Sequence, residues 1–270
     1  MKIQWLGTAA AEGWPAVFCT CEACKKAAQL GGKNIRTRAG AIVDDVLLID
    51  LNPDLYAQKL SLGLDLCLLK DIIVTHNHGD HLTPLYIEFR KAVYYGKALP
   101  VIPIYGPYDI MDDLMPYKEY LEMHTVAAGD EFDTAMHHVT VLPAVHSAKN
   151  GKFYLIEREG KSFLYMHDTG FQCDEALEML KQRVRHPIDV ISMDCTYGPN
   201  PLPPNYTSHM GFAENIKLKE RFMRDGVADG HTRFVSNHFS HNGHMLHEDM
   251  CKYMEPYGIE IAYDGMIAEI

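Results

Sequence analysis

Four residues that can bind metal ions fall within one short segment of the chain, which reads HNHGDH. His76 and His78 are two positions apart, so in extended backbone their imidazoles point the same way and can hold one ion together. Gly79 permits a turn that sends Asp80 and His81 to a second position nearby. The spacing therefore predicts a loop that holds two metals, although polar residues of these types also occur in ordinary solvated loops.

A second group of metal-binding residues lies near the start of the sequence. Cys19, Cys21 and Cys24 occur in the segment CTCEAC. Three thiolates need one further ligand to complete the closed tetrahedral site that is typical of structural zinc. The alternatives are buried thiols without a ligand and a redox pair.

The elements that position these groups can be predicted from short apolar runs bounded by Gly, Asp, Asn or Pro. The HNHGDH segment directly follows such a run. We expect strands over residues 2–7, 39–43, 46–50, 71–75, 137–143, 152–157, 161–166, 188–193 and 232–236. We expect helices over residues 82–93, 174–184, 211–225 and 246–254.

The two halves of the chain repeat one order of strands, a polar loop and a helix. Two sheets packed face to face with helices outside would bury this pattern. No Gly/Ser linker divides the sequence, so we expect a single domain over residues 1–270, with an N-terminal zinc-knuckle hairpin. The proline-rich segment 197–208, YGPNPLPPNYTS, is too stiff to extend a strand and is interpreted as a loop and a candidate active-site lid.

Composition excludes several classes of protein. The formal net charge of −11 opposes binding to a phosphate backbone, so general nucleic-acid binding is not expected. No run approaches the length of a membrane-spanning helix, so we expect no membrane partner. The seven cysteines are an odd number, and the opening MKIQWLGT lacks the apolar stretch of a signal peptide, from which we expect a reducing, cytoplasmic location. Four of these cysteines lie in apolar surroundings and are expected in the core: Cys67, Cys173, Cys195 and Cys251.

The HxHxDH pattern, with strands before it and a helix after it, resembles the metallo-β-lactamase superfamily. The resemblance implies an α/β fold, a four-layer αββα sandwich of two mixed sheets with outer helices. It also implies further ligands in strand-end loops, and the segments LPAVHSA, LYMHDTG and FVSNHFSH supply His146, Asp168 and His238. Each of these three could instead be a surface, turn or cap residue.

On the superfamily pattern, the ligands divide between two divalent ions. One ion would take His76, His78 and His146, the other Asp80, His81 and His238, and Asp168 would bridge them. Strand alternation would point His167 away from the ions. Zinc and manganese both suit these donors. A di-iron centre is disfavoured because the flavin-linked di-iron branch has a glutamate at the position of His78.

The cysteine trio, together with Gly7, Thr8, Gly13 and Pro15, resembles the phosphonate-pathway cyclic phosphodiesterase branch of the superfamily. In that branch a histidine three residues after the last active-site histidine lies close to the cysteines, which implies His241 here. His244 is a rival for this place. The completed site would be a structural zinc that supports the loop carrying His238.

Catalysis on such a site requires more than metals. Two ions about 3.5 to 4 Å apart can activate a shared water and neutralise phosphoryl oxygens, but an alkoxide leaving group also needs a proton. His209 is the candidate general acid, since relatives place a histidine in a similar context; its alternative is a helix cap. We expect His209 and Asp80 to be the catalytic residues. Asp50 and Asp194 are either carboxylates that orient metal-bound histidines or simple strand terminators.

The resemblance implies a hydrolase acting on a small cyclic phosphate, either a ribosyl 1,2-cyclic phosphate or a 2',3'-cyclic nucleotide, through a hydroxide that bridges the metals. The alternatives are a cofactor-biosynthesis oxygenase like the pyrroloquinoline quinone pathway member, a thiolester or lactone hydrolase, and a metal-binding scaffold without activity. A transfer-RNA processing nuclease would need a basic exosite, which the acidic charge opposes. The partner expected is a small phosphodiester, and a homodimer is compatible with the sequence.

Overall fold

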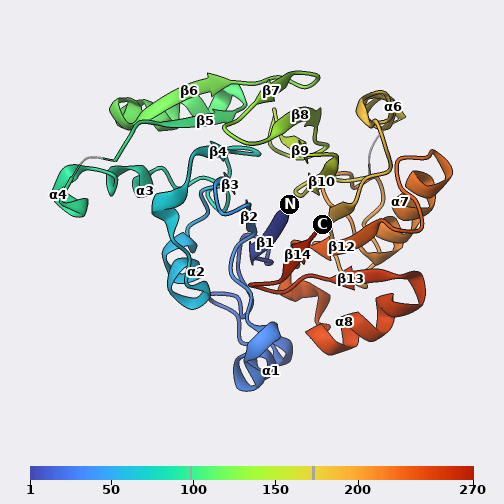
Figure 1. Ribbon diagram of the computed structural model, residues 1–270. Coiled ribbons are helices and arrows are strands. Elements are labelled where there is room, and N and C mark those ends of the chain that lie inside the picture. The colour runs from blue at the N-terminus through green and yellow to red at the C-terminus, as the bar shows by residue number, and fades with distance from the viewer. Residues whose placement is uncertain (98, 172–173) are drawn as a thin grey trace.

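Two seven-stranded mixed sheets form the centre of the computed structural model, which describes residues 1–97, 99–171 and 174–270 (Figure 1). In each sheet, three neighbouring strand pairs are antiparallel and the other three are parallel. The two halves of the chain were predicted to repeat one order of strands and helices. The structure has two sheets with the same number of strands and the same mixture of parallel and antiparallel pairs. This confirms the α/β fold class.

The first sheet has the order β14-β1-β2-β3-β4-β5-β6. Its parallel part is β3 to β6. The strands are β1 (Lys2–Gly7), β2 (Gly40–Val43), β3 (Leu47–Ile49), β4 (Asp71–Ile73), β5 (Ile102–Gly106), β6 (Leu121–Thr125) and β14 (Ile267–Glu269).

The second sheet has the order β13-β12-β11-β10-β9-β8-β7. Its parallel part is β10 to β13. The strands are β7 (Glu131–Asp133), β8 (His138–Pro143), β9 (Lys152–Arg158), β10 (Lys161–Met166), β11 (Val190–Asp194), β12 (Arg233–Asn237) and β13 (Ile259–Ile261).

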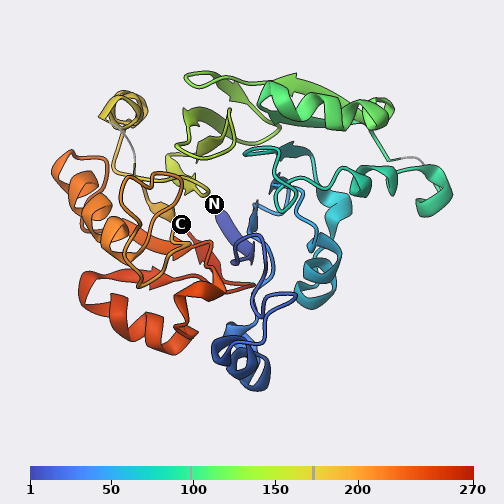
Figure 2. The same cartoon turned by 180° about the vertical axis from the view of Figure 1, so that it is seen from behind.

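Helices surround the two sheets, as the view from behind also shows (Figure 2). The α-helices are α1 (Glu22–Leu30), α2 (Leu55–Leu62), α3 (Leu85–Glu88), α4 (Ala92–Tyr95), α5 (Met111–Leu114), α6 (Asp174–Arg183), α7 (Phe212–Arg224) and α8 (His247–Met254). Short 3-10 helices are η1 (Gly32–Asn34), η2 (Leu66–Leu68), η3 (Tyr108–Ile110), η4 (Met115–Tyr120), η5 (His241–Gly243) and η6 (Glu255–Tyr257). Within the described ranges, no helix is long and apolar enough to cross a membrane.

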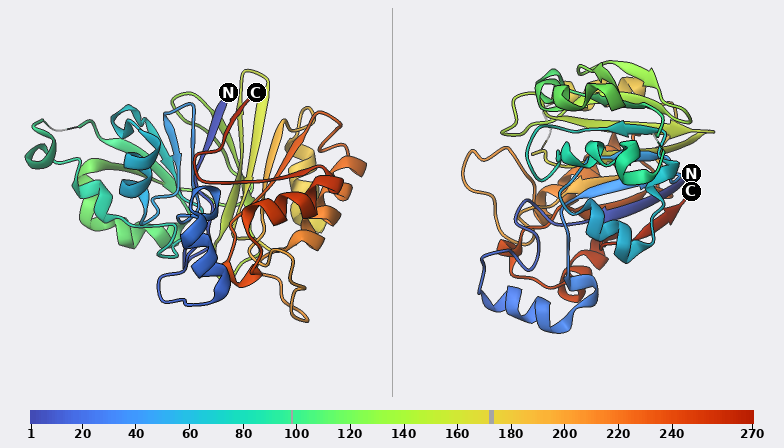
Figure 3. Two further views of the ribbon diagram at one scale, coloured as in Figure 1. Left: turned by 90° about the horizontal axis from the view of Figure 1, so that it is seen from below. Right: turned by 90° about the vertical axis from the view of Figure 1, so that its left-hand side faces the viewer.

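The core has three parts, which correspond to the spaces between the four layers (Figure 3). Apolar residues of both sheets meet in the middle, where Trp5 and Phe163 pack edge to face with ring centroids 5.9 Å apart. Leu55 of α2 and Ile87 of α3 belong to the part that covers the first sheet. Helices α1, α6, α7 and α8 contribute to the part that covers the second sheet. Burial on both faces explains why the strands read as apolar runs.

All nine predicted strands are present, with boundaries shifted by up to two residues, and three of the four predicted helices match α6, α7 and α8. The helix predicted over residues 82–93 is wrong. The chain forms two single turns there, α3 and α4, because Pro84 sits at the start of α3 and Lys91 is extended at φ −62°, ψ 147° between them.

The cysteines outside the trio are only partly in the core. Cys195 is buried and Cys251 is partly buried, whereas Cys67 is exposed, contrary to the prediction. Cys67 lies in η2, a short surface turn capped by the side chain of Asp65, so apolar neighbours in the sequence do not bury it. Cys173 lies outside the described residues.

Candidate metal centre

The predicted metal ligands lie in loops that follow strands. His76 and His78 follow β4, Asp168 follows β10 and His238 follows β12. Because β10, β11 and β12 are parallel, the loops at their carboxyl ends meet at one edge of the sheet. The fold therefore brings together side chains that are widely separated in the sequence.

Three residues at this edge have left-handed backbone. Asp50, Asp168 and His238 have φ angles of +67°, +47° and +61°. Such angles are uncommon outside glycine and cost free energy, so they occur where the surrounding structure enforces them. Each of the three residues immediately follows a strand or comes one residue later, where the turn re-aims the side chain.

The first group of ligand atoms comes from His76, His78, His146 and Asp168, which all lie within 4.8 Å of one another. His146 Nε2 is 3.2 Å from His78 Nδ1, and His76 Nε2 is 3.2 Å from Asp168 Oδ2. A tetrahedral cation with bonds of about 2.0 to 2.1 Å keeps its ligand atoms about 3.3 Å apart. The spacing of this group suits one cation.

The second group comes from Asp80, His81, Asp168 and His238, again within 4.8 Å. His81 Nε2 is 3.3 Å from Asp80 Oδ2 and 3.1 Å from Asp168 Oδ2. His238 Nε2 is 2.6 Å from Asp168 Oδ1. Asp168 thus belongs to both groups and offers its two oxygens to different histidines, which is the arrangement of a bridging carboxylate.

Hydrogen bonding in this region fits a pair of divalent cations. The Nε2 atoms of His76, His81 and His238 are buried, and among the described residues none meets them with hydrogen-bond geometry, although oxygens of Asp168 lie close. Buried polar atoms normally have a bonding partner. A metal ion that accepts the lone pairs of these nitrogens would supply one.

The opposite sides of the rings are held by the protein. His81 Nδ1 is 2.7 Å from Asp50 Oδ2, and His146 Nδ1 is 3.1 Å from the Ser208 carbonyl. A proton on Nδ1 leaves the Nε2 lone pair free for a metal. Asp50 therefore contacts His81, a predicted ligand, as expected for a carboxylate that orients a metal-binding histidine.

The charges of the buried groups differ between the histidines. Burial lowers the pKa of His76 and lowers that of His146 to about 4, so both rings are neutral, as metal ligands must be. Burial also disfavours the charged form of His81, but the carboxylates of Asp168 and Asp50 outweigh it and raise the pKa of His81 well above its usual value. Positive charge is thus stabilised beside Asp168, where a cation can replace the proton.

His209 lies beside these two groups. Its Nδ1 is 2.9 Å from Asp194 Oδ2, and its ring stacks on His238 with centroids 5.7 Å apart. Burial lowers the pKa of His209, but the carboxylates of Asp194, Asp168 and Asp80 outweigh this effect and raise it to about 9. These carboxylates favour the protonated ring of His209, which sits next to the candidate cation site.

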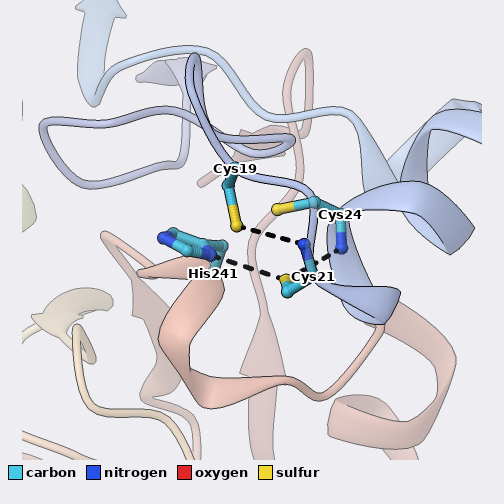
Figure 4. A group of neighbouring side chains, drawn as sticks. All are labelled: Cys19, Cys21, Cys24 and His241. Atoms are coloured by element: carbon cyan, nitrogen blue, oxygen red, sulfur yellow. Dashed lines mark hydrogen bonds between the residues drawn. The ribbon is translucent and has the colours of Figure 1, made fainter.

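The cysteine trio and His241 form a separate group within 4.8 Å, which Figure 4 shows. Cys19 and Cys21 lie on the loop before α1, Cys24 lies in the first turn of α1, and Cys21 Sγ is 3.9 Å from His241 Nδ1. Among the described residues this group does not include His244, the rival candidate. Backbone N–H groups of Cys21 and Cys24 donate to Cys19 Sγ and Cys21 Sγ, both at 3.4 Å.

Two thiols of this group differ in pKa. A hydrogen bond from the Cys24 backbone and the contact with His241 lower the pKa of Cys21 to about 6. Burial raises the pKa of Cys24 to about 11. A cation would favour the thiolate of both residues, because metal binding releases the thiol protons.

The loop that carries His238 and His241 is attached to the N-terminal segment. Phe239 N donates to the Thr8 carbonyl at 2.9 Å, and Ala10 N donates to the Phe239 carbonyl at 3.0 Å. The two candidate sites therefore share one loop.

The sequence was then compared with known proteins. Residues 46–263 match the family model described as a β-lactamase superfamily domain. The chain belongs to the metallo-β-lactamase superfamily. Comparison with curated proteins gives no significant match.

Solved structures with the metallo-β-lactamase fold resemble this one over the whole chain. A diphosphatase from the PhnP family is 23% identical, with a TM-score of 0.77 over 100% of this chain and 97% of that chain. Zinc-bound PqqB from Methylobacterium extorquens is 19% identical, with a TM-score of 0.71 over 100% of both chains. The short form of human tRNase Z is 16% identical, with a TM-score of 0.65 over 100% of this chain and 99% of that chain. At these identities the likeness shows the fold alone.

In this member of the metallo-β-lactamase superfamily, two hydroxyl residues support the site and were missed in the sequence. Thr75 Oγ1 is 3.0 Å from His76 Nδ1 and donates to Asp50. Thr196 Oγ1 is 2.8 Å from His238 Nδ1 and 3.1 Å from His209 Nδ1. The only sequence signal for Thr75 is its position directly before His76, and Thr196 has none.

Two further expectations concern the surroundings of the site. His167 Nε2 is 2.7 Å from Ser192 Oγ, so the His167 side chain points away from the metal groups, as strand alternation predicts. Residues 197–208 form a loop, as expected, and Tyr206 stacks on His209 with ring centroids 6.2 Å apart. Asp194 was expected either to orient a metal-bound histidine or simply to end a strand. In the structure its carboxylate contacts His209, the candidate acid.

Proposed function

We propose that the chain is a metal-dependent phosphodiesterase that hydrolyses a small cyclic phosphate. The observation that carries this proposal is the position of His209, a protonated imidazole held by Asp194 beside a site suited to two cations. Hydrolysis of an alkyl phosphodiester needs both a means to stabilise negative charge and a donor for the leaving oxygen.

The residues that would hold the cations are those of the two groups described above. We assign His76, His78 and His146 to one cation, Asp80, His81 and His238 to the other, and Asp168 to both. Zinc or manganese bound there would activate a water and neutralise charge on the phosphoryl oxygens. Cys19, Cys21, Cys24 and His241 would hold a third, structural zinc.

His209 would give its proton to the leaving oxygen. Asp194 fixes the ring through Nδ1, so Nε2 is the atom left to donate. The same carboxylate favours the protonated ring at neutral pH. Asp80 belongs to the second group of ligand atoms, and its negative charge also favours this proton.

Further observations support a small, anionic substrate. A PhnP-family diphosphatase shares the fold over the whole chain, and the thiol group resembles the cysteine pattern of that branch. The fold is also shared with human tRNase Z, but a net charge of −11 disfavours a large polyanion. A small cyclic phosphate, such as a ribosyl 1,2-cyclic phosphate or a 2',3'-cyclic nucleotide, is the substrate class we propose.

Replacing His209 tests the proposal. The metal-loaded protein and His209→Ala are assayed with 2',3'-cyclic AMP and with bis-p-nitrophenyl phosphate, whose nitrophenolate leaves without a proton. We expect the variant to lose about 100-fold or more in rate on the cyclic substrate and less than about tenfold on the activated one. The exposed His231→Ala is the matched control and should keep both rates.

Equal losses on the two substrates would reject His209 as the acid. Turnover of a lactone or thiolester, with no turnover of either phosphodiester, would reject the phosphodiesterase.

A further inference from the structure

A large cavity lies on the outer face of the first sheet, away from the metal groups. Its volume is about 790 Å³, and its walls come from the sheet, α2, η2, α3 and the segment that leads into α4. Figure 1 shows α2, α3 and α4 together at one side of the molecule. None of the residues assigned to the metal groups lines it. Cavities of this volume are typical of sites for small molecules.

The walls of the cavity are mostly aliphatic and aromatic. Leu48 and Ile72 form the floor from β3 and β4, and Leu55 contributes from α2. Near the opening, Tyr56, Leu85, Phe89 and Tyr94 are large apolar side chains with 63%, 49%, 46% and 58% of their surface exposed. Exposed apolar surface gathered around one opening is a common sign of a binding site.

The charged residues of this cavity have one sign. Lys59 and Arg90 line it, and no Asp or Glu is among the described residues that line it. This contrasts with a chain whose formal net charge is −11. An anionic group entering the cavity would meet no carboxylate on its walls.

Arg90 is the more informative of the two cations. One terminal nitrogen donates to the Pro100 carbonyl at 2.7 Å, but Nε is buried and has no hydrogen-bond partner within residues 1–97, 99–171 and 174–270. Among the described residues no carboxylate forms an ion pair with it, and burial lowers its pKa. A guanidinium in a partly buried position is normally paired with an anion, because leaving it unpaired is costly.

We propose that this cavity binds a single-chain anionic amphiphile, with the hydrocarbon chain against the partly exposed Leu66, Leu69 and Tyr86 and the carboxylate on Arg90. An apolar interior with a cationic residue at its edge matches the two ends of a fatty acid. The site is independent of the proposed phosphodiesterase activity, since it shares no residue with the metal groups.

Binding of decanoate, below its critical micelle concentration, tests the proposal by isothermal titration calorimetry. We expect saturable binding of one decanoate per chain. Decyltrimethylammonium and decyl glucoside, with the same chain and a cationic or neutral head, should bind at least about tenfold more weakly. Adding two methylenes to the acid should tighten binding about tenfold, because each methylene is buried.

Variants locate the site. Arg90→Met keeps much of the apolar stem and should weaken decanoate binding about tenfold. Arg185→Met removes an exposed arginine outside the cavity and should leave binding unchanged. The metal content of both variants should equal that of the parent, which shows that they are folded.

A second readout does not depend on a variant. Cys67 lines the cavity and is exposed, so its alkylation by N-ethylmaleimide can be followed by peptide mapping. Decanoate should slow this alkylation at least about fivefold at saturation, with no effect on the alkylation of Cys251.

Three results would overturn the proposal. Equal binding of the three decyl amphiphiles would indicate nonspecific adsorption, and unchanged alkylation of Cys67 would place decanoate elsewhere. A dimer that Phe89→Ser converts to monomer, with no decanoate binding, would make this face a contact between two copies of the chain.

Discussion

The histidine–aspartate groups and the thiol group are built in different ways. Candidate ligands of the first come from loops between positions 76 and 238, and most are buried. Three of the four residues of the second occur between positions 19 and 24, and only Cys24 is fully buried. The first site therefore depends on the fold to assemble it. The second is largely encoded in one loop, and a cation there can help to fix that loop on His241.

This difference predicts how each site fails. Loss of one residue from the fold-assembled site should abolish chemistry but leave the thiol site filled. Loss of a thiol should empty its own site and affect the chemistry only through the shared loop of His238 and His241.

The largest effect is expected for Asp168→Asn. One oxygen of Asp168 lies near His76 and His81 and the other near His238, so the change weakens both proposed cations. We expect activity to fall about 1,000-fold or more, and the metal content to fall from about three ions per chain to about one. Metal analysis by mass spectrometry measures this, with the exposed Asp174→Asn as the control. Retention of three ions would contradict the shared role of Asp168.

An intermediate effect is expected from pH. His209 must be protonated to act as an acid, so the rate on the cyclic substrate should fall as pH rises through its pKa. That pKa is about 9 for the side chains alone, and bound cations will lower it, so the decline should lie below pH 9.

Replacing the carboxylate that raises this pKa sharpens the test. Asp194→Asn should move the decline to lower pH, whereas Asp189→Asn, at the other end of β11, should not move it. If the rate of His209→Ala still falls over the same pH range, the fall is caused by the titration of a residue other than His209.

The smallest effect on the chemistry is expected for Cys21→Ser. It should remove about one zinc per chain and reduce activity about tenfold or less, because the loop of His238 keeps its backbone contacts with residues 8 and 10. Thermal stability should decrease as well. His244→Ala is the matched control and should retain the zinc. Zinc loss in both Cys21→Ser and His244→Ala, with zinc retained in His241→Ala, would exchange the roles of His241 and His244.

The strands and the HNHGDH residues were predicted from local patterns, whereas His146, Asp168, His238 and His241 were implied by the resemblance to the superfamily. An apolar run marks a strand, and a polar residue after it marks the edge where loops converge. The broken helix over residues 82–93 shows the limit of this reasoning, since Pro84 and the extended Lys91 decide the backbone locally.

Contacts between distant segments that the superfamily resemblance does not imply could not be predicted. The link between Asp194, Thr196 and His209 depends on how the loop 197–208 returns to β11, which no local pattern encodes. Strands β5, β6, β7, β13 and β14 were missed, and several of them are short or lie at sheet edges. The cavity beneath α2 and α3 depends on packing between elements and has no counterpart in a linear pattern.

The left-handed backbone at Asp50, Asp168 and His238 has a consequence for protein engineering. Glycine at any of these positions would relax the main chain by roughly 1 kcal/mol and could raise the melting temperature of the metal-free protein. The same exchange would delete a carboxylate or an imidazole from the centre. A directed-evolution screen that rewards heat resistance alone would therefore tend to collect inactive scaffolds, so each round should also select for retained metal.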